Sequence, residues 1–206
     1  MSIQKEKCPT WAGKALQGLT FWVGHRQALY SGYLLSEGAL VAETCNLIYA
    51  NLSSEESLHC EVPYGALTLT SKDSTIARKT RIDLVVAAKK IGPTEPKDGD
   101  LQPLATAAVE IKRASASRKE IDQDIERLAK LKVENPNIRT FLFLVSENKR
   151  PSRFVSKKGC AVKGDFAIAG STCYYSVRRA CKAARSFSGH DSSHYACIIE
   201  IFDHAS

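Results

Sequence analysis

The order of three segments between residues 106 and 146 constrains the fold more than any other feature of this chain. TAAVEIKRA (106–114) has the length and composition of a β-strand, and TFLFLVS (140–146) is a continuous apolar run, typical of a strand buried on both faces. Between them, a helical pattern (118–133) is apolar on one side and charged on the other. Its apolar positions recur every three or four residues: Ile121, Ile125, Leu128 and Leu131. A strand, an amphipathic helix and a second strand predict an α/β fold.

The preceding sequence adds a helix and two strands. Ser36 is a favourable N-cap for a helix over SEGALVAETCNLIYANL. LHCEVPYGALTLT (58–70) predicts a short strand broken by Pro63 and Gly65, with a second strand-like patch around Leu67 to Thr70. RIDLVVA (81–87) predicts a dense, β-branched strand. Residues 89–103 are rich in proline and glycine, so we expect a loop there. Residues 10–33 are mixed, with apolar residues spaced loosely like one face of a helix.

The C-terminal part adds one more helix and one more strand. YYSVRRACKAARSF (174–187) predicts an amphipathic helix, and HYACIIEIF (194–202) predicts a last strand. We therefore predict a single domain over residues 1–206, built as a mixed central β-sheet flanked by helices. Its αβββαβ core covers about 36–146, and the C-terminal helix and strand at about 174–202 form an extension.

Charge and composition restrict the function. The chain carries a formal net charge of +7 with a pI near 9.0, which favours a polyanionic partner. A composition of 44% hydrophobic and 25% charged residues is typical of a globular protein. No run of 18 apolar residues predicts a membrane span, and the N-terminus MSIQKEKCPTW lacks the apolar run of a signal peptide. We expect a cytoplasmic protein without a membrane partner.

The cysteines and histidines do not predict a metal site. The seven cysteines are scattered along the chain: Cys8, Cys45, Cys60, Cys160, Cys173, Cys181 and Cys197. No two of them form a C-x-x-C pair, so we predict reduced core residues rather than zinc ligands. His190 and His194 are four residues apart, but in a segment that predicts a turn, where they would not converge on one ion. The sequence also lacks a Walker loop, a G-x-S-x-G elbow and a G-x-G-x-x-G fingerprint.

Two charged residues interrupt the apolar strand at 106–114. Glu110 and Lys112 are two positions apart, so on a strand they point to the same face. Asp83, in the apolar strand RIDLVVA, would lie alongside if the two strands pair. Two carboxylates suit a hard cation such as Mg²⁺, and a lysine can orient or deprotonate a water and neutralise a phosphate. The three residues predict metal-assisted phosphodiester hydrolysis.

The order of these elements, with Asp83 on one strand and E-x-K on the next, resembles the PD-(D/E)XK nuclease superfamily, which has the restriction-endonuclease-like fold. The resemblance covers roughly residues 36–146. It implies that Asp83 and Glu110 bind Mg²⁺, with Mn²⁺ able to substitute, and that Lys112 assists the nucleophilic water. Ile82 stands where the family name has proline, and the proline-rich loop at 92–103 accounts for the long separation of Asp83 from Glu110.

Many members of that superfamily carry a further glutamate on the first helix, close to the metal. We prefer Glu43 as this catalytic and metal-binding residue, since it shares a helical stripe with apolar residues. Glu37 is the alternative, although it could instead be a first-turn acid that favours the helix dipole. Glu61 is a further candidate near the metal, or else an exposed strand residue. For Asp122 and Asp124 we favour the helix-dipole interpretation.

Basic residues near the predicted site are candidates for binding nucleic acid. Arg78, Lys79 and Arg81 precede the Asp83 strand, and Arg113 follows Lys112. In the predicted C-terminal helix, three further residues form one basic stripe: Arg178, Lys182 and Arg185. For both groups a solvated polar surface is the alternative interpretation.

The resulting hypothesis is a Mg²⁺-dependent deoxyribonuclease, endo rather than exo, and the resemblance implies a role in restriction, repair or anti-phage defence. Little chain lies outside the core, so we expect weak intrinsic specificity or a partner subunit that supplies it. The oligomeric state is open, with a homodimer among the alternatives. A second hypothesis is a catalytically silent nucleic-acid-binding or assembly module on the same fold. A third is an RNase or toxin-type effector, which would differ in contacts to the 2′-OH.

Overall fold

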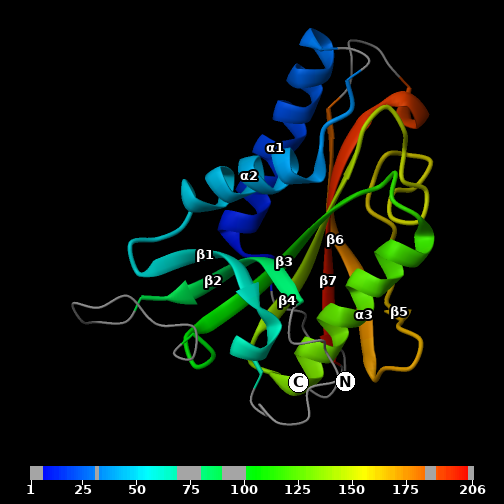
Figure 1. Ribbon diagram of the computed structural model, residues 1–206. Helices are drawn as coiled ribbons and strands as arrows, with labels where there is room; N and C mark the ends of the chain where they lie inside the picture. Colours follow the sequence, from blue (N-terminus) through cyan, green and yellow to red (C-terminus); the bar gives the residue numbers. More distant parts are fainter. Residues whose placement is uncertain (1–6, 31–32, 69–79, 90–100, 184–188, 204–206) are drawn as a thin grey trace.

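A computed structural model of the chain describes residues 7–30, 33–68, 80–89, 101–183 and 189–203 (Figure 1). The helices are α1 (Thr10–Leu29), α2 (Glu37–Tyr49) and α3 (Arg118–Glu134), with short 3-10 helices η1 (Tyr64–Ala66) and η3 (His190–Ser192). The strands are β1 (Glu56–Pro63), β2 (Arg81–Ala88), β3 (Ala105–Arg113), β4 (Arg139–Ser146), β5 (Phe166–Ala167), β6 (Cys173–Ala183) and β7 (His194–Asp203). The fold is therefore mixed α/β, as predicted.

The seven strands form one mixed sheet in the order β1-β2-β3-β4-β7-β6-β5. Only β3 and β4 pair in parallel among the described strands, and α3 is the crossover between them. Helices α1 and α2 lie on one side of the sheet and α3 on the other (Figure 1). The order α2-β1-β2-β3-α3-β4 is the predicted αβββαβ core, and it is confirmed.

Local sequence signals account for the starts of α2 and α3. The Ser36 side chain accepts a hydrogen bond from Ala39 N–H at 3.1 Å, which confirms it as the N-cap of α2. Ser117 caps α3, and Glu120 returns a hydrogen bond to the Ser117 N–H, so the two form a capping box. These caps fix where each helix begins, and both helices begin next to the C-terminal end of β3.

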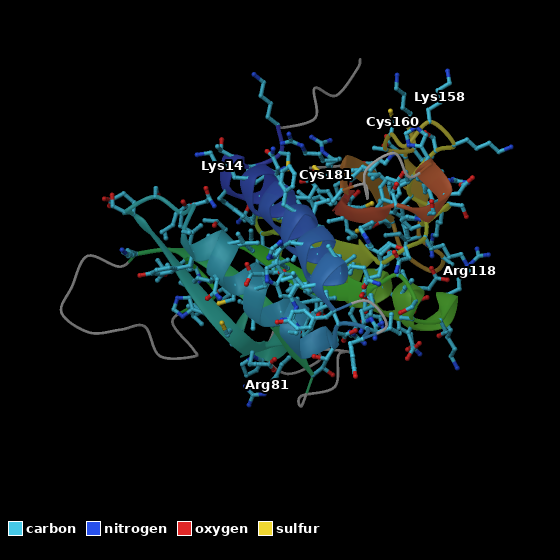
Figure 2. All side chains as sticks on the ribbon, turned by 90° about the horizontal axis from the view of Figure 1, so that it is seen from above. Lys14, Arg81, Arg118, Lys158, Cys160 and Cys181 are labelled. Atoms are coloured by element: carbon cyan, nitrogen blue, oxygen red, sulfur yellow. The ribbon has the colours of Figure 1, made fainter. Side chains whose placement is uncertain are left out.

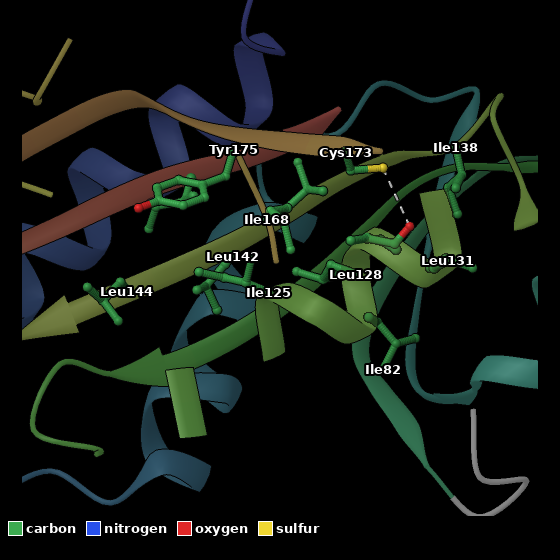
Figure 3. Packing of buried hydrophobic residues seen from close by; sticks show 14 of the residues in the cluster. Ile82, Ile125, Leu128, Leu131, Ile138, Leu142, Leu144, Ile168, Cys173 and Tyr175 are labelled. Carbon is green, nitrogen blue, oxygen red and sulfur yellow. Dashed lines mark hydrogen bonds between the residues drawn. The ribbon is translucent and has the colours of Figure 1, made fainter. Parts of the chain in front are cut away.

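Each face of the sheet carries its own hydrophobic core. Figure 3 shows apolar residues of α3, among them Ile125 and Leu128, against Leu142 and Leu144 of β4. On the opposite face the apolar side of α1 packs on β4 and β7, and Trp11 meets Phe141 edge to face at 6.2 Å between ring centroids. Burial on both faces explains why β4 is a continuous apolar run.

The helix predicted over 174–187 is wrong, because residues 173–183 form strand β6. Tyrosine, valine and cysteine side chains there alternate between the two faces, and β6 pairs with β7 over ten residue pairs. Residues four apart share a face on a strand as well as on a helix, so the basic stripe did not distinguish the two. Pairing with the apolar strand β7 outweighs the helix propensity of alanine, arginine and lysine in this segment.

The cysteines are all free, as predicted, but they are not all core residues. Cys173 and Cys197 are buried, whereas Cys60 and Cys160 are exposed. The prediction of core cysteines is therefore wrong for the second pair, which lie on the surface of the protein. Within the described ranges, none of the helices is long and apolar enough to cross a membrane.

Candidate functional site

The pairing of β2 with β3 brings Asp83 to Glu110. The antiparallel register that pairs Leu84 with Val109 places Asp83 opposite Glu110, one position beyond the last ladder pair. There the Ile111 N–H donates to Asp83 Oδ2 at 2.7 Å, and the two carboxyl groups share a side-chain hydrogen bond. The predicted juxtaposition of these two carboxyl groups is present in the structure.

Glu110 lies in a buried setting that opposes its charge. Its side chain accepts a hydrogen bond from the Tyr64 hydroxyl at 2.7 Å, and the Arg127 guanidinium lies 3.9 Å away. Burial and the neighbouring Asp83 charge raise the pKa of Glu110 to about 9. Burial also raises the pKa of Asp83, although the Ile111 N–H opposes that shift. At neutral pH the pair therefore holds a proton that a bound cation would displace.

Lys112 extends from the same face of β3 and is held between two acids. Its Nζ lies 2.9 Å from Glu37 Oε1 and 3.3 Å from Asp124 Oδ2. Burial lowers the pKa of Lys112, but the hydrogen bonds and charges of Glu37 and Asp124 outweigh it and raise the pKa above its usual value. The ammonium therefore stays protonated at neutral pH.

The structure brings Glu37, and not Glu43, to this cluster. Glu37 is the first residue of α2 and contacts Lys112, because the first turn of the helix lies against the end of β3. Glu43 is half-buried later on α2, and within the described residues it makes no hydrogen bond or ion pair to Asp83, Glu110 or Lys112. Whether Glu37 or Glu43 contacts a metal stays a prediction.

Sequence reasoning missed three members of the cluster: Tyr64, Asp124 and Arg127. The dipole role expected for Asp124 is wrong, because it is the seventh residue of α3, is buried, and pairs with Lys112 and Arg127. The signal was available, since Asp124 interrupts the apolar stripe of α3 beside Ile125. Tyr64 carried no such signal, because nothing local in the sequence marks its hydroxyl as buried.

Glu61 adjoins the site from the edge strand β1. Its neighbours Cys60 and Val62 pair with Leu84 and Ile82, so Glu61 lies opposite Asp83. Its φ of 55° is the left-handed region, which costs energy for a residue other than glycine. Its charge contributes to the raised pKa of Asp83.

The predicted nucleic-acid-binding residues do not form one surface. Arg81 donates to the Glu61 carbonyl at 2.6 Å, Arg113 pairs with Glu147 at 3.5 Å, Arg178 pairs with Glu200 at 3.1 Å, and Lys182 contacts His190 at 3.4 Å. Arg78, Lys79 and Arg185 lie outside the described residues. Figure 2 shows Arg81 on one side of the molecule, well apart from Lys14, Arg118 and Lys158. Arg113 alone among the described candidates is adjacent to the cluster in sequence.

A large cavity opens beside the cluster, at the C-terminal ends of the parallel strands β3 and β4. Its volume is about 1130 Å³, and its walls include Arg113, Arg150, Arg153, Phe154 and Tyr175. In open α/β sheets, ligands commonly bind outside the carboxyl ends of the strands. Arg113 follows Lys112 in the sequence, but the cavity is not lined by the side chains of the charged cluster.

The cluster offers carboxylate oxygens, the ligand type that a hard divalent cation prefers. Across the described residues, no group of three or more histidine, cysteine, aspartate or glutamate side chains is gathered tightly enough to hold a metal ion. Asp83 and Glu110 therefore offer two protein ligands, and Mg²⁺ commonly binds through one or two carboxylates and keeps several waters. Burial is the largest cause of the raised pKa of both carboxyl groups, and the acidic groups near them add to it.

Comparisons with known proteins identify no family. The chain matches no family model and no curated protein. A solved structure of NucC from P. aeruginosa, in its cAAA-bound form, is similar at 13% identity and a TM-score of 0.36. The similarity covers 63% of this chain and 52% of the NucC chain, so it spans about half the length of that protein. A similarity this slight assigns neither an activity nor a ligand to this chain.

Proposed function

We propose that this chain is a metal-dependent nuclease that hydrolyses DNA phosphodiester bonds endonucleolytically, with Mg²⁺ as its cation and Mn²⁺ able to replace it. The observation that carries the proposal is the buried Asp83–Glu110 carboxyl pair with Lys112 on the same face of β3. Glu37, Glu110 and Asp124 pair with Lys112 or Arg127, and Asp83 adds a fourth carboxyl group beside Glu110, so the acidic groups of the cluster outnumber its two cationic groups.

Asp83 and Glu110 would hold the cation, which supplies a more acidic bound water and stabilises charge on the phosphate. The Ile111 N–H fixes the orientation of Asp83, and the Tyr64 hydroxyl fixes that of Glu110. Both carboxyl groups are therefore held in place before a ligand binds, which lowers the entropy cost of binding.

Lys112 acts through its charge in this proposal. A lysine whose pKa is raised is a poor general base, so deprotonation of water by Lys112 is disfavoured. Its protonated Nζ is suited to orient the attacking water and to stabilise negative charge on the phosphate. Asp124 and Arg127 contact each other and flank Lys112 and Glu110, so they act as positioning residues.

Arg113 and the adjoining cavity are the proposed path for the substrate. Arg113 lines the cavity, where a flanking phosphate would meet its guanidinium. Arg178 and Lys182 lie on β6, outside the cluster, whereas Arg81 contacts the Glu61 carbonyl beside it. We therefore propose weak intrinsic sequence preference or a specificity subunit, in a cytoplasmic protein of restriction, repair or anti-phage defence.

The test is a cleavage assay with supercoiled plasmid, linear duplex, single-stranded DNA and RNA, in Mg²⁺, Mn²⁺ or EDTA. We expect nicking of plasmid in Mg²⁺ or Mn²⁺ and none in EDTA, with Lys112→Ala slower by at least about 100-fold. Lys14→Ala is the matched control, since it removes an exposed lysine on α1, outside the cluster and outside the predicted nucleic-acid-binding residues, and should cut at the wild-type rate.

Other outcomes separate the competing functions. Nucleic-acid binding without cleavage under every metal would support the silent module, for which the ion-paired state of Lys112 is the favouring observation. Cleavage of RNA but not DNA would support the effector ribonuclease. Cleavage that persists in EDTA or in Lys112→Ala would contradict the proposed site.

A further inference from the structure

The thiols of Cys45 and Cys60 are in contact. Cys45 lies on α2 and Cys60 on the edge strand β1, and their Sγ atoms are 3.5 Å apart. Cys60 is exposed and Cys45 is half-buried, so a small oxidant can reach the pair from solvent. A disulfide places two sulfurs about 2.05 Å apart, so a modest side-chain rotation would bring them to bonding distance.

We propose that Cys45 and Cys60 are a thiol modification site that a hydroperoxide converts to a reversible disulfide. Two features distinguish this pair from the other cysteines. Cys173 and Cys197 are buried and therefore protected, while Cys160 is exposed but has no sulfur within contact among the described residues. Within the described residues, the pair on α2 and β1 combines an exposed thiol with a second thiol whose Sγ is in contact.

The reaction balances with one peroxide as the oxidant. One thiolate attacks a peroxide oxygen, the O–O bond breaks, and the sulfur becomes a sulfenic acid while hydroxide leaves as water. The second thiolate then attacks that sulfur, the S–S bond forms, and the second hydroxide leaves as water. Two thiols lose two electrons and two protons in total, and one peroxide is reduced to two waters.

The disulfide would join the two elements that hold acidic groups around the candidate site. Helix α2 begins at Glu37, which contacts Lys112. Cys60 precedes Glu61, which lies opposite Asp83. Oxidation would thus restrict α2 relative to β1, and it would close a loop over residues 46–59. By constraining the unfolded chain, such a loop is expected to raise the Tm by about 5 °C or more.

The test treats the folded protein with hydrogen peroxide, blocks remaining thiols with N-ethylmaleimide in denaturant, and maps the modified residues by mass spectrometry. We expect a loss of two hydrogens and five blocked cysteines instead of seven. Trypsin leaves both cysteines in one peptide (27–72), so cleavage after Glu55 and Glu56 is needed to separate them. The linked pair should then appear as two peptides joined through sulfur, which dithiothreitol separates.

Variants distinguish this pair from unspecific oxidation. Cys60→Ser and Cys45→Ser should lose the link and the rise in Tm, while Cys160→Ser, a matched change at an exposed cysteine, should keep both. A link that forms only after unfolding in guanidine, a lower Tm after linkage, or sulfinic acid at Cys60 without a link would overturn the proposal. Disulfide mapping and Tm do not depend on cleavage, so these measurements test the thiol site whether or not the protein is a nuclease.

Discussion

Two clusters of charged groups lie on opposite faces of the sheet, and their charge balance is opposite. Beside α3, three carboxyl groups pair with the two cationic groups, Asp83 adds a fourth next to Glu110, and burial raises the pKa of Glu110 to about 9. Beside α1, a single carboxylate, Glu200, accepts hydrogen bonds from Arg139 at 2.7 and 2.9 Å and pairs with Arg178 at 3.1 Å. In the second cluster both carboxylate oxygens of Glu200 contact an arginine. In the first cluster the carboxyl groups outnumber the cationic groups.

The difference separates a structural role from a functional one. A buried carboxylate held by two guanidiniums contributes to the folded state, and removing one partner leaves uncompensated charge. An excess of buried carboxyl groups instead opposes folding until a proton or a cation neutralises it. We therefore expect the Glu200 cluster to determine stability without metal and the Asp83–Glu110 pair to couple stability to metal.

The largest effect is expected at Glu200. Replacing it with alanine leaves Arg139 and Arg178 without their shared carboxylate, so the free energy of unfolding should fall by about 3 kcal/mol. In thermal denaturation this corresponds to a Tm about 10 °C lower, with or without Mn²⁺. Asp191→Ala is the control, because Asp191 also pairs with an arginine but is exposed, and should change the Tm little. An unchanged Tm in Glu200→Ala would show that the Glu200 cluster does not contribute to stability as proposed.

The next effect is expected at Asp83, where Mn²⁺ should stabilise the wild-type protein. At a Mn²⁺ concentration 100 times Kd the gain is about 2.7 kcal/mol, and Asp83→Asn should lose most of it. Thermal denaturation with increasing Mn²⁺ measures the shift, and Asp122→Asn serves as a matched change, since Asp122 pairs with Arg153 instead. An equal Mn²⁺ shift in both variants would place the metal elsewhere.

A third effect is expected at Glu110 in EDTA. Its pKa is about 4.5 in the unfolded chain and about 9 in the folded one, so the folded state binds the proton more tightly. The stability this provides is present in full below pH 4.5 and is lost as the pH rises through 9. Glu110→Gln has no such loss, so at pH 8 its free energy of unfolding should exceed the wild-type value.

Denaturation across pH 4 to 9 measures how the difference in free energy of unfolding between Glu110→Gln and wild-type changes with pH. The two proteins should be about equally stable near pH 4, and the advantage of Glu110→Gln should grow with pH. Mn²⁺ should reverse the order at pH 8, because only wild-type keeps both carboxylates. A variant that is less stable than wild-type at pH 8 in EDTA would show that the pair is held by other contacts.

The sequence predicted the site through periodicity and failed where tertiary contacts decide. Glu110 and Lys112 interrupt an apolar strand at a spacing of two, so their shared face followed from strand geometry. The position of Asp83 beside Glu110 required only that the strand carrying Asp83 pair with the strand carrying Glu110. Asp124, by contrast, reaches Lys112 only because α3 packs across β3, and no local rule fixes that contact. The strand at 173–183 was missed for the same reason, since its partner β7 determines it.

The smallest effect separates the two candidate glutamates of α2. Glu37→Gln removes the negative charge 2.9 Å from Lys112, so the ammonium should orient less well and cleavage should slow by about 3- to 10-fold. Glu43→Gln should leave the rate within twofold, because Glu43 has no such contact in the described structure. The two changes are matched, since they alter the same helix by the same substitution, and cleavage rates in Mn²⁺ measure both. A slower Glu43→Gln beside an unchanged Glu37→Gln would mean that α2 shifts when metal binds, and that the acid-rich cluster is completed from further along the helix.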